Sequence, residues 1–448
     1  MEKTYYYRAK PVKYPYLSLY KGFIYTFARV HIDFFAASKY SKISTKKEGV
    51  CLTLTELSVA LGIDIPAERF AAYSPIPDGR RDALCTLSLI ERLEERFGLF
   101  GDYYEDVKTG FEAIERDPAR REYMDMLSLY ILDRDMPDTG TLPYPPYVGT
   151  PASAMLPLLV HLPSIERLYD SMRKRGFTHE EAKTTLSVYR QYMREEKLYR
   201  GGFVGVSGGI SNWMAYFTKG HFFYPGYAGL NFHLTNIAHN DPYFLRNRRT
   251  GEVIAVCGEL QTFHRSGLVL GSAGAEDEEG AFTALFEETD DAYIGNPVRH
   301  YRTLRERERF PKTDWELALK PLDRVLGTHI FFDADLSPEQ VDIALREARR
   351  MGEQYFPECG FKGIYCSSWM MNPIVGEILG KQSKINGFAS RFMRYHKKSL
   401  ANLYRSFVFP GKYDSDEQLP ENTTLQRAFK KRLLEGGYIY ETPGVIIY

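Results

Sequence analysis

The sequence predicts an α+β protein in which a helical N-terminal domain, residues 1–200, precedes a domain built on a mixed β-sheet, residues 201–448. Apolar residues recur at helical spacing through the first half. After Gly201 and Gly202 the pattern changes to short runs rich in β-branched and aromatic residues, separated by glycine turns. A chain of 448 residues also exceeds what one hydrophobic core usually holds, so two domains are expected.

The first half is predicted to be mainly helical. Each predicted helix has apolar residues three or four positions apart and is bounded by turn signals. A proline-rich span, Leu142–Pro151, interrupts the helical pattern and is predicted to be a connection. The predicted helices are Thr53–Leu61, Arg81–Phe97, Tyr104–Glu115, Arg120–Leu132, Ser164–Arg175 and His179–Arg200.

The second half is predicted to contain most of the strands, with glycine turns between them. The small, acidic segment Ser272–Gly280 is predicted to be an exposed hairpin tip. Near the end of the chain we expect a helix over Asn422–Glu435 and a closing hairpin that pairs Tyr438–Glu441 with Val445–Tyr448. The other predicted strands are Gly226–Leu234, Glu252–Phe263, Ser266–Gly271, Phe282–Glu288 and Ser406–Phe409.

The most informative segment is a predicted strand–helix–strand unit. Val325–Phe332 is a short apolar run typical of a buried strand. Ser337 then supplies a helix N-cap, with Pro338 at the first helical position and a capping-box partner after it, and the helix is expected to end near Tyr355. Phe361–Trp369 is predicted to be the second strand. Such a unit puts the loop after the first strand at the end of the sheet where ligands usually bind.

The composition excludes several classes of function. Lysine plus arginine equals aspartate plus glutamate, 58 each, so no net positive field recruits nucleic acid or a membrane. No apolar run approaches the ~18 residues of a transmembrane helix, and the N-terminal residues show no apolar signal segment. Five cysteines form no Cys-x-x-Cys pair, which indicates reduced thiols, and no spacing resembles a zinc site. We therefore expect a cytoplasmic protein with no metal, no nucleic-acid partner and no membrane partner.

Several segments, in order along the chain, resemble a bacterial acyltransferase-domain family. Members of that family pair a helical N-terminal domain with a C-terminal domain like the GNAT N-acyltransferases. The resemblance runs from about Trp213 to Arg394 and departs from the family at Ser367, where a Cys-His-Ser-Trp strand end has histidine. The segments that carry it are Trp213, Tyr227–Phe232, Lys320–Ile330, Leu336–Glu339, Cys366–Trp369 and Ser383–Phe392.

The resemblance implies N-acyl transfer from a thioester donor, such as acyl-CoA or acetyl-CoA, to an amine of a small-molecule or peptidyl acceptor. That chemistry needs a phosphate cradle, a base for the amine proton and an acid for the leaving thiolate. His329 is the titratable side chain of its buried strand and is the predicted base, with Glu259 as a second base candidate. Tyr365 is the predicted acid. Ser367 and Ser368 are expected at the acyl channel, since splayed strands there would admit an acyl chain.

The phosphate cradle is predicted in the turn after the first strand, where backbone N–H groups meet a helix N-terminus. The turn lacks the glycine-rich sequence of GNAT proteins and carries Asp333 and Asp335, whose carboxylates oppose an anion. The arginines of Pro297–Lys312 offer other phosphate contacts, although a solvated face with Glu306 and Glu308 as partners also explains them. The predicted cradle residues are Phe332, Asp333, Ala334, Leu336 and Ser337, with Ser368 nearby.

Each assignment has an alternative. His329 could be a core histidine bonded to backbone, Tyr365 a structural tyrosine and Glu259 a solvent-facing strand residue. The GNAT-like domain could bind a ligand or partner without catalysis. Gly205–Gly209 matches the Gly-x-Ser-x-Gly elbow of hydrolases, but a helix rather than a long strand precedes it. Leu52–Ile63 hints at a helix-turn-helix, without the basic residues that DNA binding needs.

Overall fold

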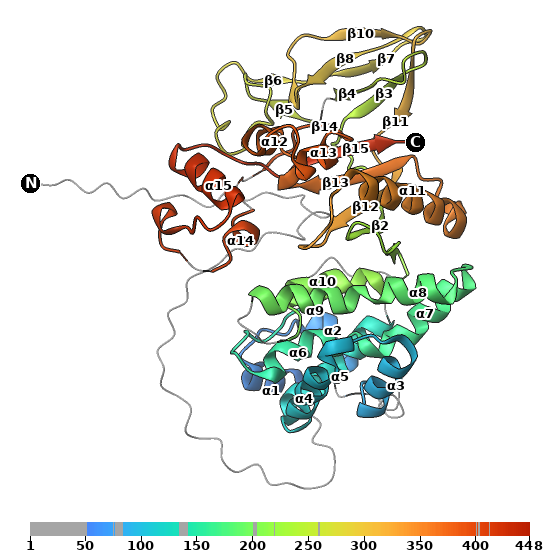
Figure 1. The fold of residues 1–448 in the computed structure, drawn as a ribbon, viewed down its shortest axis with the longest axis vertical. Helices are drawn as coiled ribbons and strands as arrows, with labels where there is room; N and C mark the ends of the chain where they lie inside the picture. Colours follow the sequence, from blue (N-terminus) through green and yellow to red (C-terminus); the bar gives the residue numbers. More distant parts are fainter. Residues whose placement is uncertain are drawn as a thin grey trace, which may run out of the picture.

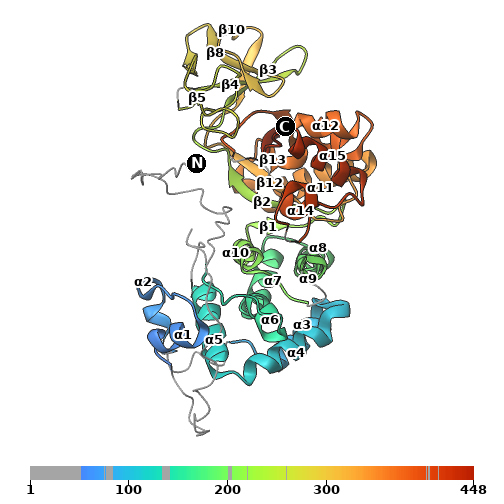
Figure 2. The same ribbon diagram turned by 90° about the vertical axis from the view of Figure 1, so that its left-hand side faces the viewer.

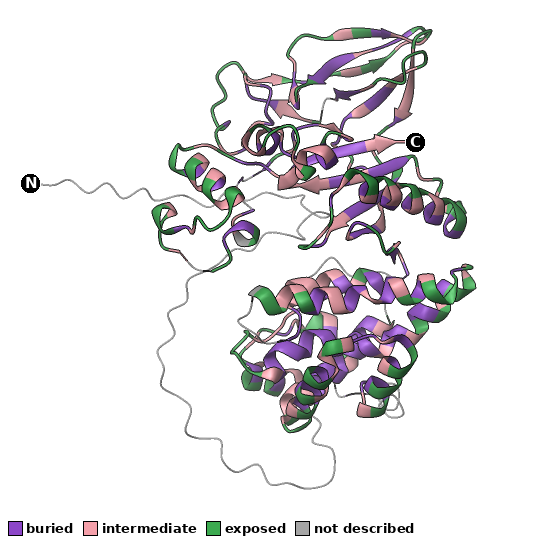
Figure 3. Cartoon of the chain, viewed as in Figure 1, coloured by how far each residue is buried: buried purple, intermediate pink, exposed green. Residues whose placement is uncertain are grey.

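A computed structural model describes residues 52–74, 76, 84–133, 142–199, 204–218, 220–258, 260–399, 401, 404–411 and 413–448. Helices α1–α10 gather at one end of the molecule, and the strands lie at the other end with α11–α15 (Figures 1 and 2). Buried residues line the interior of both ends (Figure 3), and one hydrophobic core contains Phe217 of the helical part together with Phe232 and Leu326 of the sheet. The predicted α+β class is confirmed. The predicted boundary after residue 200 falls among residues outside the described ranges and stays a prediction.

The helical part follows the predicted pattern, but α2 and α10 were not predicted and α3 begins at Leu87 rather than Arg81. The predicted helix His179–Arg200 is divided into two helices at Ser187. The helix α6 was missed because it begins at the end of the proline-rich span, where Pro151 takes the first helical position and Thr150 Oγ1 accepts a hydrogen bond from the Ser153 N–H at 3.3 Å. No helix in the described ranges is long and apolar enough to cross a membrane. The helices are α1 (Leu54–Leu61), α2 (Ala67–Phe70), α3 (Leu87–Phe97), α4 (Tyr104–Glu115), α5 (Pro118–Asp133), α6 (Pro151–Leu159), α7 (Ile165–Lys174), α8 (His179–Leu186), α9 (Val188–Tyr199) and α10 (Gly208–Phe217).

A six-stranded central sheet has the order β1-β2-β12-β13-β15-β14. In this sheet β12 and β13 run parallel and are joined by α11 (Pro338–Tyr355), which confirms the predicted strand–helix–strand unit. The other neighbouring pairs are antiparallel. Val341 and Ala344 of α11 pack in one core with Leu326 and Ile364, so the helix covers one face of the sheet. The strands are β1 (Phe222–Phe223), β2 (Leu230–Asn236), β12 (Arg324–Ile330), β13 (Gly363–Ser368), β14 (Met393–Arg394) and β15 (Thr442–Ile447).

A second, seven-stranded sheet covers part of the opposite face. Its main order is β10-β8-β4-β3-β11, and β7 and β9 also pair with β8. Phe244 and Ala255 of this sheet share a core with Val325 and Val445 of the central sheet. Its strands are β3 (Tyr243–Asn247), β4 (Val253–Cys257), β7 (Phe286–Glu288), β8 (Ala292–Arg299), β9 (Arg302–Thr303), β10 (Glu308–Pro311) and β11 (Trp315–Leu319), and a separate pair consists of β5 (Thr262–Phe263) and β6 (Phe282–Thr283).

Several predicted elements of the second half are wrong in detail. The predicted strand Glu252–Phe263 is divided into β4 and β5, and Ser266–Gly271 contributes a single bridge at Val269. Ser406–Phe409 is not a strand. It overlaps helix α14, which ends at Val408, because Tyr404 and Val408 are four residues apart and both enter a core with Phe429. The remaining helices are α12 (Pro373–Leu379), α13 (Lys384–Ala389), α14 (Arg405–Val408) and α15 (Thr424–Leu434).

The predicted closing hairpin is also wrong, because Thr442–Ile447 forms one strand between β13 and β14. The sequence Thr-Pro-Gly looked like a turn. In the structure, the Pro443 carbonyl accepts a hydrogen bond from the Tyr395 N–H at 3.1 Å, on the side where β14 ends. Proline has no N–H to donate. At Pro443 the absent donor would point toward the end of β14, a strand of two residues, so its absence removes little strand pairing.

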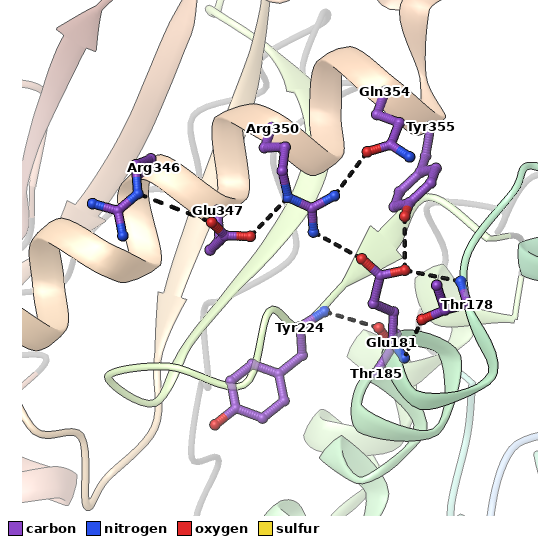
Figure 4. Close-up of polar contacts among 9 residues, drawn as sticks. All are labelled: Thr178, Glu181, Thr185, Tyr224, Arg346, Glu347, Arg350, Gln354 and Tyr355. Carbon is purple, nitrogen blue, oxygen red and sulfur yellow. Dashed lines mark hydrogen bonds and ion pairs between the residues drawn. The ribbon is translucent and has the colours of Figure 1, made fainter.

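A polar network joins α8 of the helical part to α11 of the sheet part (Figure 4). The Glu181 carboxylate accepts hydrogen bonds from Arg350 Nη2 at 2.7 Å, from the Tyr355 hydroxyl at 2.7 Å and from the Thr178 N–H at 2.8 Å. Arg350 also donates to Glu347 at 2.7 Å. One carboxylate thus satisfies donors from two different parts of the fold.

We expect Glu181→Ala to lower the free energy of unfolding by about 1–3 kcal/mol, because it leaves the Arg350 guanidinium and the Tyr355 hydroxyl without this acceptor. Urea unfolding followed by circular dichroism measures the change. Glu180→Ala is the control, since that side chain is 81% exposed on the same helix. An equal loss in both variants would contradict the role of the network.

The effect of Glu181 should also depend on pH. Burial alone would raise the pKa of Glu181, but the hydrogen bonds from Tyr355, Thr178 and Arg350 outweigh burial and lower it to about 2, from 4.5. The stabilisation is therefore complete above pH 4.5 and is lost as the pH falls toward 2. The difference in unfolding free energy between wild type and Glu181→Ala should shrink between pH 6 and pH 3. A difference that stays constant would show that the carboxylate charge is not involved.

Candidate functional site

The central sheet opens where β12 and β13 separate. These two strands pair through Leu326 with Ile364 and Gly327 with Tyr365. Beyond these positions, the rest of β12 is registered with β2 and the rest of β13 with β15. The two parallel strands therefore diverge at their carboxyl ends, which is where open sheets usually bind ligands. Backbone groups left unpaired between them can bond to a ligand or to water.

His329 lies on β12 at this opening, enclosed by aromatic side chains. The Trp213 ring of α10 lies 4.0 Å from the imidazole between centroids, and the His233 ring lies 4.9 Å from it. Trp213 Nε1 donates a hydrogen bond to the Tyr192 hydroxyl at 2.9 Å, which fixes the indole. Burial and the neighbouring His233 hold the pKa of His329 well below its usual range. The imidazole is therefore neutral at pH 7, with one ring nitrogen that can donate a hydrogen bond and one that can accept a proton.

Two buried polar side chains beside the opening have no hydrogen-bond partner among the described residues. Asn231 is opposite His329 in the β2–β12 register and is completely buried, with both amide atoms unpaired. The hydroxyl of Thr328, on the other face of β12, is unpaired as well. An unsatisfied buried polar group costs about 1–3 kcal/mol, which a ligand or an ordered water can recover. The sequence analysis did not assign either residue to the site, although Asn231 is part of the Tyr227–Phe232 segment.

Two glycines permit the close packing around β12. At Gly327, an added Cβ would overlap the His233 ring, so a larger residue would displace it. Gly229 has a φ of 69°, and an added Cβ would lie 2.9 Å from the Cα of Ala334. The Gly229 carbonyl also accepts a hydrogen bond from the Phe331 N–H at 2.9 Å. The turn after β12 is thereby held against the start of β2.

The two acidic residues of that turn have cationic partners. Asp333 Oδ2 lies 2.6 Å from Arg194 Nη1, and Asp335 Oδ1 lies 2.9 Å from Lys384 Nζ. Arg194 comes from α9 and its guanidinium also lies 5.5 Å from the centre of the Phe332 ring. The carboxylates are therefore balanced locally, which the sequence did not indicate because both partners are distant along the chain.

Ser337 differs from its predicted role at the start of α11. It occupies the N-cap position, but its hydroxyl and its N–H both bond to the Asp335 carboxylate at 3.1 Å, so the predicted capping box is wrong. Two N–H groups of the predicted cradle are therefore in use, since the Ala334 N–H also donates to the Phe331 carbonyl at 3.1 Å. The Leu336 side chain is buried in the hydrophobic core, so this residue can face a ligand through its backbone alone.

The predicted residues of β13 lie next to the opening. Ser367 Oγ donates a hydrogen bond to Glu441 at 3.0 Å, and burial raises the pKa of that carboxyl. Ser368 Oγ accepts a hydrogen bond from the Met370 N–H at 3.2 Å and so caps the turn that follows. Tyr365 lies opposite Gly327, on the face that contacts the second sheet. Glu259 lies outside the described residues.

Glu195 on α9 is a titratable residue that the sequence analysis missed. Burial raises its pKa to about 7, and the nearby carboxylates of Glu196 and Asp333 add to the shift. Its closeness to Asp333 places it beside the turn after β12. No motif marks this residue, because its environment is created by the packing of α9 against the sheet.

Other predicted features lie away from the opening or serve packing. Ser207 caps α10 by accepting from the Ile210 N–H, and its hydroxyl donates to Glu196 at 2.9 Å, so it is not arranged as a hydrolase nucleophile. Within the described ranges, no cluster of His, Cys, Asp and Glu could hold a metal ion. The arginines of the second sheet have nearby acceptors, which fits a solvated face: Arg299 with Glu308, Arg307 with Glu287, Arg309 with Asp291, and Arg302 and Arg305 with the carbonyls of Ser266 and Gly280.

Comparison with known families finds a match within the second half of the chain. Residues 234–446 match the model of the GNAT-like C-terminal domain. The second half of the chain is therefore similar to a GNAT-like C-terminal domain. The matched segment begins in β2 and ends in β15, so it includes the opening between β12 and β13. No curated protein matches the sequence.

Solved acyltransferases share the fold over most of the chain. An acyltransferase mutant in complex with octanoyl-CoA superimposes with a TM-score of 0.57 at 18% identity. Complexes of an acyltransferase with CoA and 10C-teicoplanin, and with decanoyl-CoA and teicoplanin, both give 0.56, at 17% and 18% identity. Each comparison covers 88% of this chain and 99% of the other. Residues 234–446 make up less than half of the chain, so an overlap of 88% means that the shared fold extends into the helical part.

The raised pKa of Glu195 predicts a pH-dependent effect of Glu195→Gln. The folded-state pKa of about 7 lies above the usual 4.5, so ionisation of Glu195 destabilises the fold increasingly as the pH rises from 4.5 to 7. Removing the charge should therefore stabilise the protein more at pH 8 than at pH 5, by about 1–3 kcal/mol. Urea unfolding at both pH values tests this, with the exposed Glu95→Gln as the control. Equal effects of Glu195→Gln at both pH values would refute the shift.

Proposed function

We propose that the chain is an N-acyltransferase that moves an acyl group from acyl-CoA to an amine of a small-molecule or peptidyl acceptor. The opening between β12 and β13, inside the GNAT-like C-terminal domain, carries this proposal. A thioester arm extended between the strands would bond to the backbone groups that they leave unpaired. The solved acyltransferases of the same fold bind octanoyl-CoA, decanoyl-CoA and teicoplanin, which supports this choice of donor and acceptor.

The turn after β12 would hold the phosphates of the donor. Backbone N–H groups at the start of α11 and the helix dipole favour an anion there. Arg194 and Lys384 flank the turn and balance the charges of its two carboxylates, so the carboxylates no longer repel a bound phosphate. Phe332, Asp333 and Leu336 would contribute through their backbone, while the N–H groups of Ala334 and Ser337 are already bonded to Phe331 and Asp335.

The transfer requires two proton movements. The acceptor nitrogen attacks the thioester carbonyl carbon, the carbon–sulfur bond breaks, the nitrogen loses a proton and the departing thiolate gains one. We assign the first proton to His329, whose neutral imidazole lies at the opening, and the second to Tyr365 on the neighbouring strand. Ser367 and Ser368 would line the acyl channel at the end of β13. The described cysteines are free thiols, which together with a CoA donor fits a cytoplasmic location.

Acyl-CoA binding is the first test. Octanoyl- or decanoyl-CoA at a free concentration of one hundred times its dissociation constant should raise the free energy of unfolding by about 2.7 kcal/mol. Lys384→Ala should weaken this binding several-fold because it removes a cation from the turn, whereas Lys381→Ala, exposed in the same segment, should not. Calorimetric titration measures the affinities. Absence of binding by acetyl-, octanoyl- and decanoyl-CoA alike would refute the proposal and favour a non-catalytic module.

The proposed base is tested by His329→Ala. We expect kcat to fall by about 10²–10⁴-fold, while the dissociation constant of acyl-CoA stays the same, because the imidazole acts on the acceptor proton. The release of free CoA thiol in the presence of an amine measures kcat. The exposed His239→Ala is the matched control.

The pH profile separates His329 from Glu195 as the base. Because the pKa of His329 in the free protein is held well below its usual range, His329 itself should cause no loss of kcat/KM between pH 8 and pH 6. If Glu195 were the base, kcat/KM would fall below pH 7 and Glu195→Gln would abolish turnover. Unchanged turnover in His329→Ala would remove that residue from the mechanism.

A further inference from the structure

A separate cavity lies at the edge of the central sheet, beyond β14. Its volume is about 510 Å³, large enough for a small organic molecule. Its walls come from β14, from the start of α12 and from the turn between β8 and β9. None of the residues that surround the β12–β13 opening lines it, so acyl transfer does not account for it.

Two arginines line this cavity without a carboxylate partner among the described residues. Arg394 donates to the Met371 carbonyl at 3.3 Å, and burial without a compensating anion lowers its pKa. Arg302 donates to the Ser266 carbonyl at 2.8 Å. Both bonds go to neutral acceptors, so both positive charges remain unbalanced. A partly buried cation without an anion is unfavourable, and an anionic ligand would relieve this cost.

The other titratable groups at the cavity do not cancel the positive charges of Arg302 and Arg394. Glu377 is the acidic residue of the wall and is exposed, so solvent weakens the effect of its charge on the cavity without removing it. His300, also on the wall, is exposed. His396 packs near Arg302, but burial and that arginine lower its pKa to about 3, so it adds no charge at pH 7. The cavity thus has one more positive charge than negative.

The turn that forms one wall is held in an unusual conformation. His300 and Tyr301 connect Arg299 to Arg302 across a two-residue hairpin, with φ values of 47° and 59°. Hairpins of this type usually carry Asn-Gly, because a side chain disfavours positive φ. Here two large residues accept that conformation, and both line the cavity. Strain of this kind tends to persist where it positions side chains for binding.

We propose that this cavity binds an oxyanion, the carboxylate or phosphate group of a small acidic molecule, between the Arg302 and Arg394 side chains. Guanidinium groups suit this task because their N–H donors match the oxygens of carboxylate and phosphate. The aromatic and aliphatic wall, including Tyr301, Phe392 and Ile374, would contact the rest of the molecule. The site does not depend on acyl transfer and would exist in a non-catalytic protein as well.

Calorimetric titration of the full chain with inorganic phosphate and with succinate, at constant ionic strength, tests the proposal. Saturable binding of at least one anion is expected, and the comparison shows whether phosphate or carboxylate is preferred. Arg394→Met keeps the apolar stem and removes the charge, and it should weaken binding at least tenfold. Arg309→Met is the matched control, since that arginine pairs with Asp291 away from the cavity and its loss should leave the affinity unchanged.

A second variant guards against misfolding as an explanation. Glu377→Gln removes the carboxylate of the wall, so it should tighten anion binding several-fold, a gain that damage to the fold would not produce. Circular dichroism should show that all variants melt cooperatively. Absence of saturable binding by both anions, or equal affinity in wild type and Arg394→Met, would overturn the proposal.

Discussion

Hydrogen bonding between β12 and β13 extends over two registered pairs of residues, and the candidate site follows from this short contact. The strands stay in place because each has a longer partner on its other side. β12 is registered with β2 over seven residues, Arg324 to Ile330, and β13 with β15 over six, Gly363 to Ser368. The opening therefore costs the sheet a few hydrogen bonds without loosening either strand. Unpaired backbone at the carboxyl ends of parallel strands is what gives this fold a place for an extended ligand.

The site is built by both halves of the chain. Trp213 and Arg194 come from the helical part, yet they contact His329 and Asp333 of the sheet part. Helix α11 links the two, because its first turn follows the predicted phosphate-binding loop and its last turn is bound to α8 through Glu181 (Figure 4). The position of the α11 N-terminus is thereby tied to the docking of the helical part. We infer that the helical half is a structural component of the site and not an independent attachment.

Features set by local sequence were predictable, and features set by tertiary contact were not. The β12–α11–β13 unit was predicted because hydrophobic period, proline at the first helical position and strand composition all agree within one segment. Strand β15 was mistaken for a hairpin, since Thr442–Gly444 carries turn residues and its pairing with β13 is long-range. His329 and Ser367 were selected from their strands, but Asn231, Arg194 and Glu195 were not. Their roles arise from burial and from neighbours far along the chain, Asp333 for Arg194 and Glu195 and His329 for Asn231, which no local pattern records.

The charges around the turn after β12 bear on which residue can act as the base. Arg194 and Lys384 balance Asp333 and Asp335, and Glu195 lies close enough to Asp333 for its pKa to rise. A bound phosphate would add negative charge at this place. It would raise the pKa of Glu195 beyond about 7, so that this carboxyl would already hold a proton and could not accept one.

The same negative charge would also raise the pKa of His329, but for this residue the rise would favour its action as a base. Burial and His233 hold the pKa of His329 low, which makes the free imidazole available but weakly basic. A nearby anion favours the protonated imidazole and moves that pKa back toward neutrality, where general bases are most effective. Donor binding would thus disable Glu195 as a base and improve His329, so the electrostatics of the donor complex favour the histidine at the opening of the sheet.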